Sequence, residues 1–533
     1  MVASLIESRT LVVDDFEPMH TLLAGFLKST GIKKIEHAYN AKEALSLLGS
    51  KKYDIVLCDY NLGPGKNWMQ ILEEAKLRKF VGYSTIWIMV TAEKTMDMFM
   101  GAADTKPDDY LLKPVNEKIL ETRLNKTLEK KQSFIAIEKA MNEHNYIGAI
   151  SLCDEQIKSQ SKNTTDLLRL KGELLISIGE FAAAKELYME VLAARSVPWA
   201  KVGLGRVYYL TNEFFKAKEI LEEVLNANRM YLEAADWLAK TSEVLGDTKK
   251  SQQILLDATE ISPLSSIRQK TLADTAHSNA DLELAKTTYE KVIKLDEHSF
   301  LKSPDAYAGL AKVLVDKNSP GEALRVLDGC RKEFKNNPKA ELNTALVQSM
   351  VFKRMGRHEE ARSAIKEAKS LMDALPERAD TKTTIDVAKA LLQLGEKEEA
   401  SALFGEVIKN NHENKSIANQ IEAVFEGAGL SAEGGYLIKN SIKEVVDINN
   451  QGVLLAREGK FNEGIELLRK ALSQLQYNTQ FMINLCGMLI GLMRKEGKED
   501  RLIYETRELL ERVRKIDPTN KKYREYTTVL NQM

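Results

Sequence analysis

A small residue recurs at nearly constant intervals through most of the chain, and this repeat limits the possible fold more than any other feature. The first four intervals are 35, 33, 34 and 34 residues, and the next three are 38, 38 and 39. Turn residues and apolar residues at helical spacing flank each position, which predicts one pair of helices per interval. Because one helix pair cannot bury its apolar face alone, neighbouring pairs must stack into a solenoid. The recurring positions are Ala149, Ala184, Ala217, Ser251, Ala285, Ala323, Ala361, Ala400 and Gly464.

The repeat resembles the tetratricopeptide repeat, in which two helices share about 34 residues. Clear units lie at 170–191 and 452–471, and we count eight clear units and up to ten in all, the later ones with longer turns. The register is lost between about 411 and 447, around Gly427-Ala-Gly429 and Gly434-Gly435, where we expect an irregular helix pair or a bend. The resemblance implies a right-handed superhelix whose concave groove binds an unknown protein or peptide ligand.

The first 130 residues show a different pattern, in which short β-branched runs alternate with helical segments. We expect strands at 10–13, around Ile35, and at 55–58, 86–90 and 110–112. We expect helices at 22–27, 41–48, 68–80 and 96–103, and from Asn116 onward. Five strands alternating with five helices predict a parallel, doubly wound sheet. The predicted fold class is therefore α/β plus all-α, with one domain at 1–130 and a helical repeat domain at 131–533.

Polar residues stand where the predicted strands end. Asp14 and Asp15 follow the first strand, Asp59 ends the third, Thr91 ends the fourth and Lys113 follows the fifth. Since the carboxyl ends of parallel strands meet at one sheet edge, we expect these residues to lie together. Three carboxylates repel one another unless a cation joins them, and Mg²⁺ is the hard cation that carboxylates suit. Asp59 beside Mg²⁺ could act as a nucleophile toward phosphorus, with Lys113 and Thr91 contacting the phosphoryl oxygens.

The order and spacing of these residues resemble the receiver domains of bacterial two-component response regulators, over roughly residues 8–130. The resemblance implies a flavodoxin-like (βα)5 fold of the CheY type. Trp68 stands where many receivers carry glycine, which leaves the loop shape and the autodephosphorylation rate open. The resemblance implies Mg²⁺ ligation by Asp14, Asp15, Asp59 and the backbone carbonyl of Asn61, phosphorylation of Asp59, phosphate contacts from Thr91 and Lys113, and a switch formed by Thr91 and Tyr110.

Composition argues against several other classes of protein. The 76 basic and 77 acidic residues give a formal charge of −1, which does not favour direct nucleic-acid binding. No apolar run approaches the roughly 18 residues that a membrane span needs, so we expect a cytoplasmic protein without membrane insertion. The widely spaced cysteines suit neither a disulfide framework nor a zinc site, and we expect reduced, mostly buried thiols at Cys58, Cys153, Cys330 and Cys486.

The link between the two regions has two interpretations. Residues 115–147 contain neither glycine nor proline, which favours one long helix that passes from the first domain into the repeats. A flexible hinge near residues 130–133 is the alternative. We also expect an inter-domain or dimer contact near Met98, which does not fit the apolar face formed by Met96, Phe99, Met100 and Ala103.

These features together predict a phosphorelay response regulator. A cognate histidine kinase or phosphotransfer protein would phosphorylate Asp59, and the repeats would then gain or lose a protein partner. We expect no enzyme activity apart from Mg²⁺-dependent self-phosphorylation and autodephosphorylation at this aspartate. Three alternatives stay open, namely a scaffold in which the receiver is a constitutive docking or dimerisation module, a regulatory subunit of a separate enzyme, and a homodimer.

Overall fold

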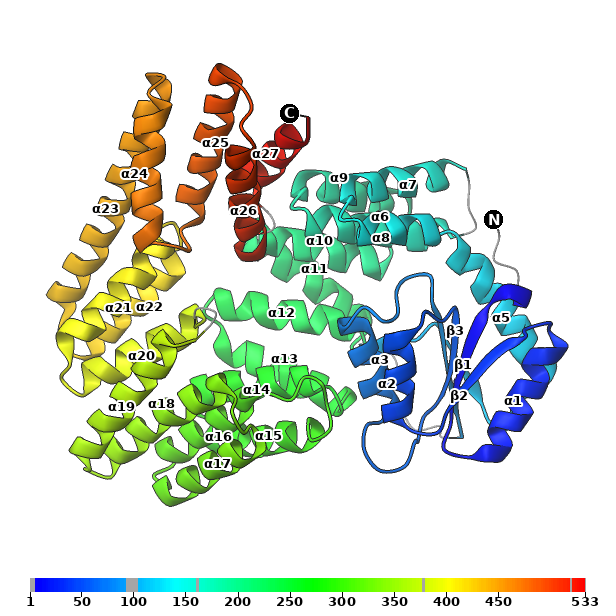
Figure 1. The fold of residues 1–533 in the computed structure, drawn as a ribbon. Coiled ribbons are helices and arrows are strands. Elements are labelled where there is room, and N and C mark those ends of the chain that lie inside the picture. The colour runs from blue at the N-terminus through cyan, green and yellow to red at the C-terminus, as the bar shows by residue number, and fades with distance from the viewer. Residues whose placement is uncertain (1–4, 93–103, 160–162, 376–378, 518–519, 533) are drawn as a thin grey trace. The chain divides into compact units, whose positions relative to one another are not determined.

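The computed structural model describes residues 5–92, 104–159, 163–375, 379–517 and 520–532. The chain divides into two compact units, one of Met1–Ile176 with Glu180–Ala306 and the other of Ser177–Gly179 with Tyr307–Met533. The first unit contains a β-sheet with its helices and the first helix pairs behind it, and the second unit is helical (Figure 1). The predicted fold class, α/β followed by all-α, is confirmed.

The sheet has five parallel strands in the order β2-β1-β3-β4-β5. All residues of β3 and β4 are buried, because helices cover both faces of the sheet, and this burial explains why their sequences are uninterrupted apolar runs. The strands are β1 (Arg9–Val13), β2 (Lys34–Ala38), β3 (Ile55–Asp59), β4 (Ile86–Thr91) and β5 (Asp109–Leu112). The helices of this domain are η1 (Leu5–Glu7), α1 (Glu17–Ser29), α2 (Ala41–Ser50), α3 (Trp68–Leu77) and α5 (Glu117–Gln132).

Each face of the sheet has its own apolar core. Leu11 and Val13 of β1 join a core with α2 and α3, whereas Val12, pointing the other way, joins a core with α1 and α5. The predicted strands all form, with boundaries shifted by a residue or two. The predicted helix at 96–103, and with it the expected contact near Met98, lies outside the described residues.

Helices α6 to α27 follow, and most of them pack against the next helix along the chain. In the first unit they are α6 (Ile135–Asn142), α7 (Tyr146–Lys158), α8 (Thr164–Ser177), α9 (Phe181–Ala194), α10 (Pro198–Leu210), α11 (Phe214–Ala227), α12 (Leu232–Val244), α13 (Thr248–Ile261), α14 (Ser266–Ser278) and α15 (Leu282–Leu295). In the second unit they are α16 (Pro304–Asp316), α17 (Pro320–Glu333), α18 (Pro338–Arg354), α19 (His358–Asp373), α20 (Thr381–Gln393), α21 (Lys397–Asn410), α22 (Lys415–Gly427), α23 (Ser431–Arg457), α24 (Phe461–Gln474), α25 (Thr479–Glu496), α26 (Asp500–Ile516) and α27 (Lys521–Gln532).

The recurring small residue has the same structural position in every unit. It is the fourth residue of the second helix of a pair, as Ala184 is in α9 and Ala217 is in α11. All eight Ala and Ser positions have an exposed fraction of 0%. Five residues earlier, the turn between the two helices contains a residue with positive φ, such as Gly179 at 72°. The period therefore combines a buried close contact between helices with a left-handed turn.

The longer intervals in the second half have two structural sources. Residues 296–303 form a longer connection between α15 and α16, which fits the expected longer turns. The helices α18 and α19 are themselves long, with 17 and 16 residues. Around 411–447 the register is lost because α23 is a single helix of 27 residues that packs against both α22 and α24. Gly434 and Gly435 lie in its first turns and do not end it.

The link between the sheet domain and the repeats is interrupted at one place. Helix α5 ends at Gln132, and α6 begins at Ile135, so the expected single helix is broken at Ser133 and Phe134. The break is anchored, because Phe134 is 5% exposed and the Ser133 carbonyl accepts a hydrogen bond of 2.9 Å from Gln156.

Two expectations from composition can be compared with the described residues. All four cysteines are free and buried, as predicted. Within the ranges that the structure covers, no helix has the length and apolar character needed to cross a membrane.

Candidate functional site

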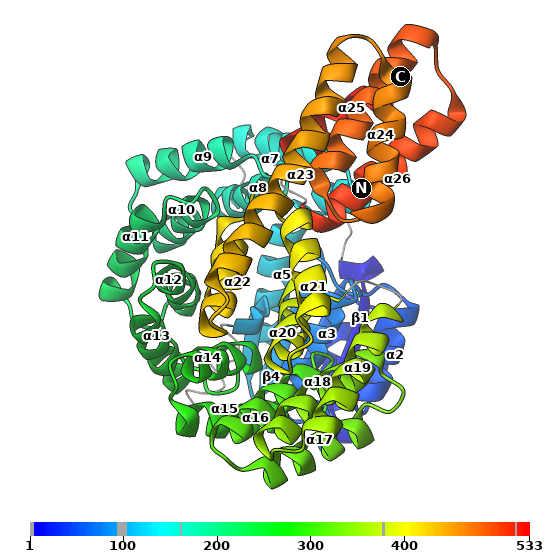
Figure 2. The ribbon, with the colours of Figure 1, turned by 90° about the vertical axis from the view of Figure 1, so that its left-hand side faces the viewer.

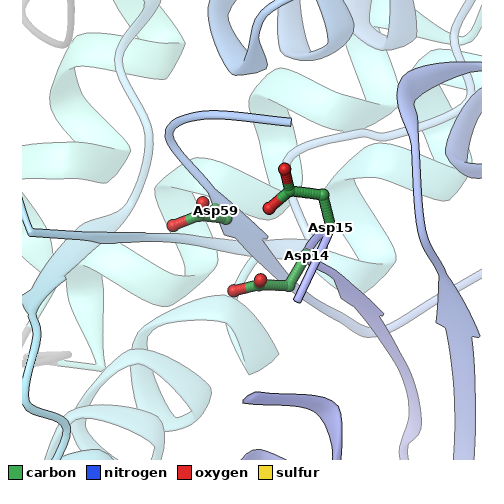
Figure 3. Close-up of side chains that lie close together, drawn as sticks. All are labelled: Asp14, Asp15 and Asp59. Atoms are coloured by element: carbon green, nitrogen blue, oxygen red, sulfur yellow. The ribbon is translucent and has the colours of Figure 1, made fainter. Parts of the chain in front are cut away.

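Three carboxylates meet at the carboxyl edge of the sheet, as the strand ends predicted. Val13 of β1 pairs with Cys58 of β3, so that Asp14 and Asp59, the next residues on each strand, lie side by side. One carboxylate oxygen each from Asp14, Asp15 and Asp59 lies within 4.8 Å of the others (Figure 3). Asp14 and Asp59 are 1% and 7% exposed, whereas Asp15 is exposed. The cluster is therefore partly open to solvent through Asp15.

Lys113 is the cation that faces this cluster. Its Nζ lies 2.8 Å from Oδ1 of Asp59 and 3.0 Å from Oδ2 of Asp14, so one lysine bridges both buried carboxylates. The Lys113 amide donates a 2.7 Å hydrogen bond to the carbonyl of Thr91, which fixes the end of β5 against the end of β4. The sheet thus positions a lysine from β5 over aspartates that follow β1 and end β3.

Burial and charge oppose each other at Asp59. Desolvation by burial, with help from the charge of Asp14, raises the pKa of Asp59 above its ordinary value even though Lys113 acts to lower it. Burial alone would lower the pKa of Lys113, but its hydrogen bonds to Asp59 and Asp14 outweigh burial and raise it. The lysine therefore stays charged, and the three carboxylates carry more negative charge than one lysine balances.

The carboxylates fit a hard divalent cation. Three carboxylates within reach of one point are the oxygen donors that Mg²⁺ prefers, and the exposed side at Asp15 leaves room for bound water. Asn61 lies on the loop after β3, and its backbone N–H donates a 3.3 Å hydrogen bond to Oδ2 of Asp59. The loop that was predicted to supply the backbone carbonyl of Asn61 is thereby held close to the cluster.

The two predicted switch residues occupy neighbouring strands. Thr91 is the last residue of β4 and is fully buried, opposite Leu112 in the register of β4 and β5. Tyr110 lies on β5 opposite Met89, two residues before Thr91, and its side chain is 42% exposed. The structure therefore brings Asp14, Asp59, Thr91 and Lys113 together at the edge, and leaves Tyr110 further back on the outer strand.

A histidine pair behind the aspartates was missed by sequence reasoning. His20 of α1 is 2% exposed, and its Nε2 lies 2.7 Å from the carbonyl oxygen of Asp14. Its Nδ1 lies 2.9 Å from Nδ1 of His37. Because a carbonyl only accepts, His20 donates from Nε2 and accepts from His37 at Nδ1. This pair fixes the backbone at Asp14, and no local spacing in the sequence marks it.

Trp68, where the sequence departs from many receivers, is a core residue. It is the first residue of α3, has an exposed fraction of 0%, and packs near Tyr60 with ring centroids 6.2 Å apart. Asn67 and Gln70 cap the helix reciprocally, which fixes where it starts. The large ring therefore fills the space under the loop that follows Asp59.

A second group of charged residues joins the sheet domain to the repeats inside the first unit. Arg268 of α14 is 4% exposed and binds Asp104 through both terminal nitrogens, at 3.1 and 3.0 Å. The same side chain binds Asp236 of α12 at 2.8 and 2.9 Å. Asp104 also accepts a 2.6 Å hydrogen bond from Ser262. One buried arginine thus holds a carboxylate of the sheet domain and a carboxylate of the repeats.

Other contacts extend this junction. Lys106 pairs with Glu233 of α12 at 3.2 Å. Gln70 of α3 donates a 3.0 Å hydrogen bond to the carbonyl of Leu295, at the end of α15. The amide of Ser84 donates a 2.7 Å hydrogen bond to Glu138 of α6. Nothing in the sequence connected these pairs, because each joins residues far apart along the chain.

Comparisons with known proteins give the same two parts. Residues 10–125 match the family described as "Response regulator receiver domain", and residues 271–299 match "Tetratricopeptide repeat". The chemotaxis protein CheY of Pseudomonas aeruginosa is 27% identical over 122 residues, which are 23% of this chain and 97% of that protein. A CheY-like receiver domain protein from Methanospirillum hungatei JF-1 is 25% identical, with 24% of this chain and 96% of that chain covered and a TM-score of 0.22. A tetratricopeptide repeat protein from Parabacteroides merdae is 14% identical, with 50% and 98% covered and a TM-score of 0.33.

Proposed function

Because the chain carries a receiver domain at its N-terminus and tetratricopeptide repeats behind it, we propose that it is a response regulator of a two-component system, phosphorylated on Asp59, whose repeats bind a protein. The observation that carries this proposal is the position of Asp59, which lies 2.8 Å from Lys113 and within 4.8 Å of carboxylate oxygens of Asp14 and Asp15. The receiver implies a phosphodonor such as a histidine kinase, and the repeats imply protein binding.

In the proposed reaction a carboxylate oxygen of Asp59 attacks the phosphorus of a phosphohistidine on the kinase or on a phosphotransfer protein. The new O–P bond forms as the P–N bond breaks, and the departing imidazole nitrogen keeps the electron pair and takes up a proton. Asp14, Asp15, Asp59 and the Asn61 carbonyl would hold Mg²⁺, which would supply positive charge that stabilises the transferred phosphoryl group. Lys113 moves from the carboxylates to a phosphoryl oxygen.

The other site residues have separate roles in this proposal. The Thr91 hydroxyl donates a hydrogen bond to the phosphoryl group, because the threonine ends the strand next to Asp59. Tyr110, which is partly exposed on the neighbouring strand, moves with Thr91 and changes the surface around β5. Hydrolysis of the acyl phosphate at the same site returns the receiver to its resting form, so the chain needs no other catalytic activity.

The junction through Arg268 offers a route from the receiver to the repeats. Asp104 and Lys106 lie shortly before β5, the strand that contains Tyr110 and ends next to Lys113. A shift of β5 changes how these two side chains meet Arg268 and Glu233. The phosphoryl group acts on this equilibrium only if it favours one arrangement of the junction over the other.

Phosphorylation of the full-length chain by acetyl phosphate with Mg²⁺ tests the proposal directly. Intact mass spectrometry should show one added phosphoryl group on the wild-type protein and none on Asp59→Asn. Asp54→Asn is the matched control, since Asp54 precedes the same strand at its other end and binds the Arg9 amide at 2.8 Å. It should be phosphorylated like the wild type. An added phosphoryl group on Asp59→Asn would refute Asp59 as the acceptor.

A second candidate function is a scaffold in which the receiver is docked permanently. The bidentate contacts of Arg268 favour it, because a buried arginine with two carboxylate partners forms a specific, preorganised junction. Hydrogen exchange at α12 and α14 separates the two candidates. Faster or slower exchange with beryllofluoride and Mg²⁺ supports the switch, whereas unchanged exchange in a beryllofluoride-saturated receiver supports the scaffold.

We further propose that the protein acts in the cytoplasm and that its partner is a protein and not a nucleic acid. The formal charge of −1 supports this choice, since a nucleic-acid binder needs a basic excess. Dimerisation through the receiver would be a further route of output, and analytical ultracentrifugation with and without beryllofluoride tests it.

A further inference from the structure

We infer that the inner face of α8, α10 and α12 binds an acidic segment of the partner protein, with Asp or Glu side chains paired to Arg169, Arg206 and Lys240. The inference rests on the proposed function, because it names the partner chemistry of the same repeats. We call this surface the Arg–Trp strip, defined by those three cations together with Trp199 and Trp237. Figure 2 shows that α8, α10 and α12 follow one another on the inner side of the first repeats.

The strip repeats one arrangement across successive helices. Arg169 of α8 lies over the ring of Trp199 of α10, with its guanidinium carbon 5.9 Å from the ring centroid. Arg206 of α10 lies over Trp237 of α12 at 5.4 Å. Lys240, one turn further along α12, approaches the same ring at 4.6 Å. Each cation is thus held in place by an aromatic ring of the next unit or of its own helix.

No ion pair within the described residues balances the charge of these three cations. Among the residues that the structure describes, Arg169, Arg206 and Lys240 form no ion pair and no hydrogen bond, and the Nε of Arg206 is buried without an acceptor. In the same repeats, Lys201 pairs with Glu223 at 2.7 Å and Lys250 pairs with Glu222. The guanidinium groups of the strip are therefore oriented by rings and keep their donors for another molecule.

The strip leads to the junction with the receiver. Lys240 lines a cavity of about 560 Å³ that also contains Gln70, Lys76 and Asp104 of the receiver and Arg268 of α14. Burial lowers the pKa of Lys76 in this cavity to about 8. A ligand that pairs with Lys240 would therefore touch the rim of the junction, which couples partner binding to the receiver.

The chemistry favours an acidic protein segment over a nucleic acid. Glu173 lies on α8, the helix of Arg169, and Glu233 lies on α12, the helix of Lys240, where it pairs with Lys106. Their negative charge disfavours a continuous row of phosphates along these helices. A polypeptide can place carboxylates opposite the cations and other side chains opposite these glutamates. Since packed helix axes lie about 8–10 Å apart, about six extended residues span the path from α8 to α12.

The test uses the full-length Asp59→Asn protein, so that it does not depend on phosphorylation. The probe is a fluorescein-labelled peptide of about a dozen residues that alternates Glu and Ser, and its binding is measured by fluorescence anisotropy. We expect binding that weakens as salt increases, and a loss of about tenfold or more on Arg206→Ala. Arg195→Ala, at the exposed end of α9, is the matched control and should leave the affinity unchanged within about twofold.

Several results would overturn the inference. One is no binding of the acidic peptide, and another is equal binding of a Gln/Ser peptide. A third is an unchanged affinity of the Arg206→Ala protein, together with binding by an Arg206→Glu protein that circular dichroism shows to be folded. Tighter, Arg206-dependent binding of an oligouridine would assign the strip to nucleic acid, and an Arg206-dependent dimer in sedimentation would assign it to a second copy. Failure of acetyl phosphate labelling leaves all these outcomes unaffected, so the two proposals fail separately.

Discussion

The receiver and the repeats differ in what they bury. The receiver buries charge, because Asp14 and Asp59 are almost inaccessible and share one lysine. The repeats bury small apolar volume, as at Ala184 and Ala217, where neighbouring helices come closest. A buried charge needs a partner from a distant strand, whereas a buried alanine needs only the next helix. The stability of the receiver therefore depends on charges brought together from separate strands, and that of the repeats on close packing between neighbouring helices.

Arg268 is an exception to this contrast, because it is a buried charge inside the repeats. Its replacement is expected to have the largest effect on the free energy of unfolding. Arg268→Ala leaves Asp104 and Asp236 close together without their shared cation. Breaking a buried ion pair costs about 3–5 kcal/mol, and the loss here lies at the lower end of that range, because Asp104 and Asp236 are 24% and 37% exposed. We expect a loss of that order in the free energy of unfolding of the first unit, measured by urea denaturation with tryptophan fluorescence.

Lys270→Ala on the same helix is the control for Arg268→Ala. Lys270 is partly exposed and pairs with Asp274 one turn away at 2.9 Å, an arrangement worth about 0.2–0.5 kcal/mol. If Arg268→Ala costs no more than Lys270→Ala, the junction adds nothing to the stability of the first unit. Buried charge would then contribute to stability in the receiver and not in the repeats.

Mg²⁺ should produce the next largest effect, and only in the receiver. At a concentration of about 100 times its Kd, a ligand that binds the folded state alone adds about 2.7 kcal/mol. We expect stabilisation of this order for the wild type, reported by Trp68 and Trp87, and much less for Asp59→Asn. Trp199 and Trp237 report the repeats and should show no direct effect. Equal stabilisation of Asp59→Asn would place the cation elsewhere.

Without Mg²⁺ we expect the Asp59 carboxylate to destabilise the folded protein. Burial raises the pKa of Asp59, so the folded state binds a proton more readily than the unfolded state. Its charge therefore lowers stability above the folded-state pKa, and this cost disappears as the pH falls below the unfolded value of about 3.9. We expect Asp59→Asn to be more stable than the wild type at neutral pH, with a difference that shrinks on acidification in thermal melts.

The same contrast explains what could be predicted from the sequence. The strands of the receiver are apolar runs that end in Asp14, Asp59, Thr91 or Lys113, so the parallel sheet alone brings these residues to one edge. The buried small residues were visible because the turn and the close contact recur together. Both signals are local in the sequence, and the fold makes them converge.

Other features depend on contacts that leave no periodic trace. His20 and Arg268 act through partners on separate elements, and no spacing distinguishes them from ordinary surface residues. For residues 411–447 the sequence left an irregular helix pair and a bend open, and the structure has a pair, α22 and α23. Gly434 and Gly435 lie in the first turns of α23 and do not bend the chain away, so the unusual length of this helix had no sequence signal. The sequence left a continuous helix and a hinge near residues 130–133 open, and the break between α5 and α6 lies beside that hinge position. Ser133 and Phe134 keep helical backbone angles, and a tertiary hydrogen bond from Gln156 to Ser133 holds the break.

The smallest effect is expected at the turns of the repeats, where stability is a matter of backbone conformation alone. Ala280 has a φ of 61° at the turn position that Gly246 occupies, with a φ of 83°, in the preceding unit. The left-handed conformation costs a residue with a Cβ about 1–2 kcal/mol, and a change to glycine removes this cost. The greater freedom of glycine in the unfolded chain offsets part of the resulting gain in stability. We expect Ala280→Gly to raise the free energy of unfolding by about 0.5 kcal/mol, and Gly246→Ala to lower it by about 1 kcal/mol. Urea titrations of the two variants measure both changes. Changes of opposite sign in the two variants would confirm that the turn conformation sets this part of the stability of the repeats. A loss of stability in both variants would show instead that packing of the Ala280 methyl group contributes.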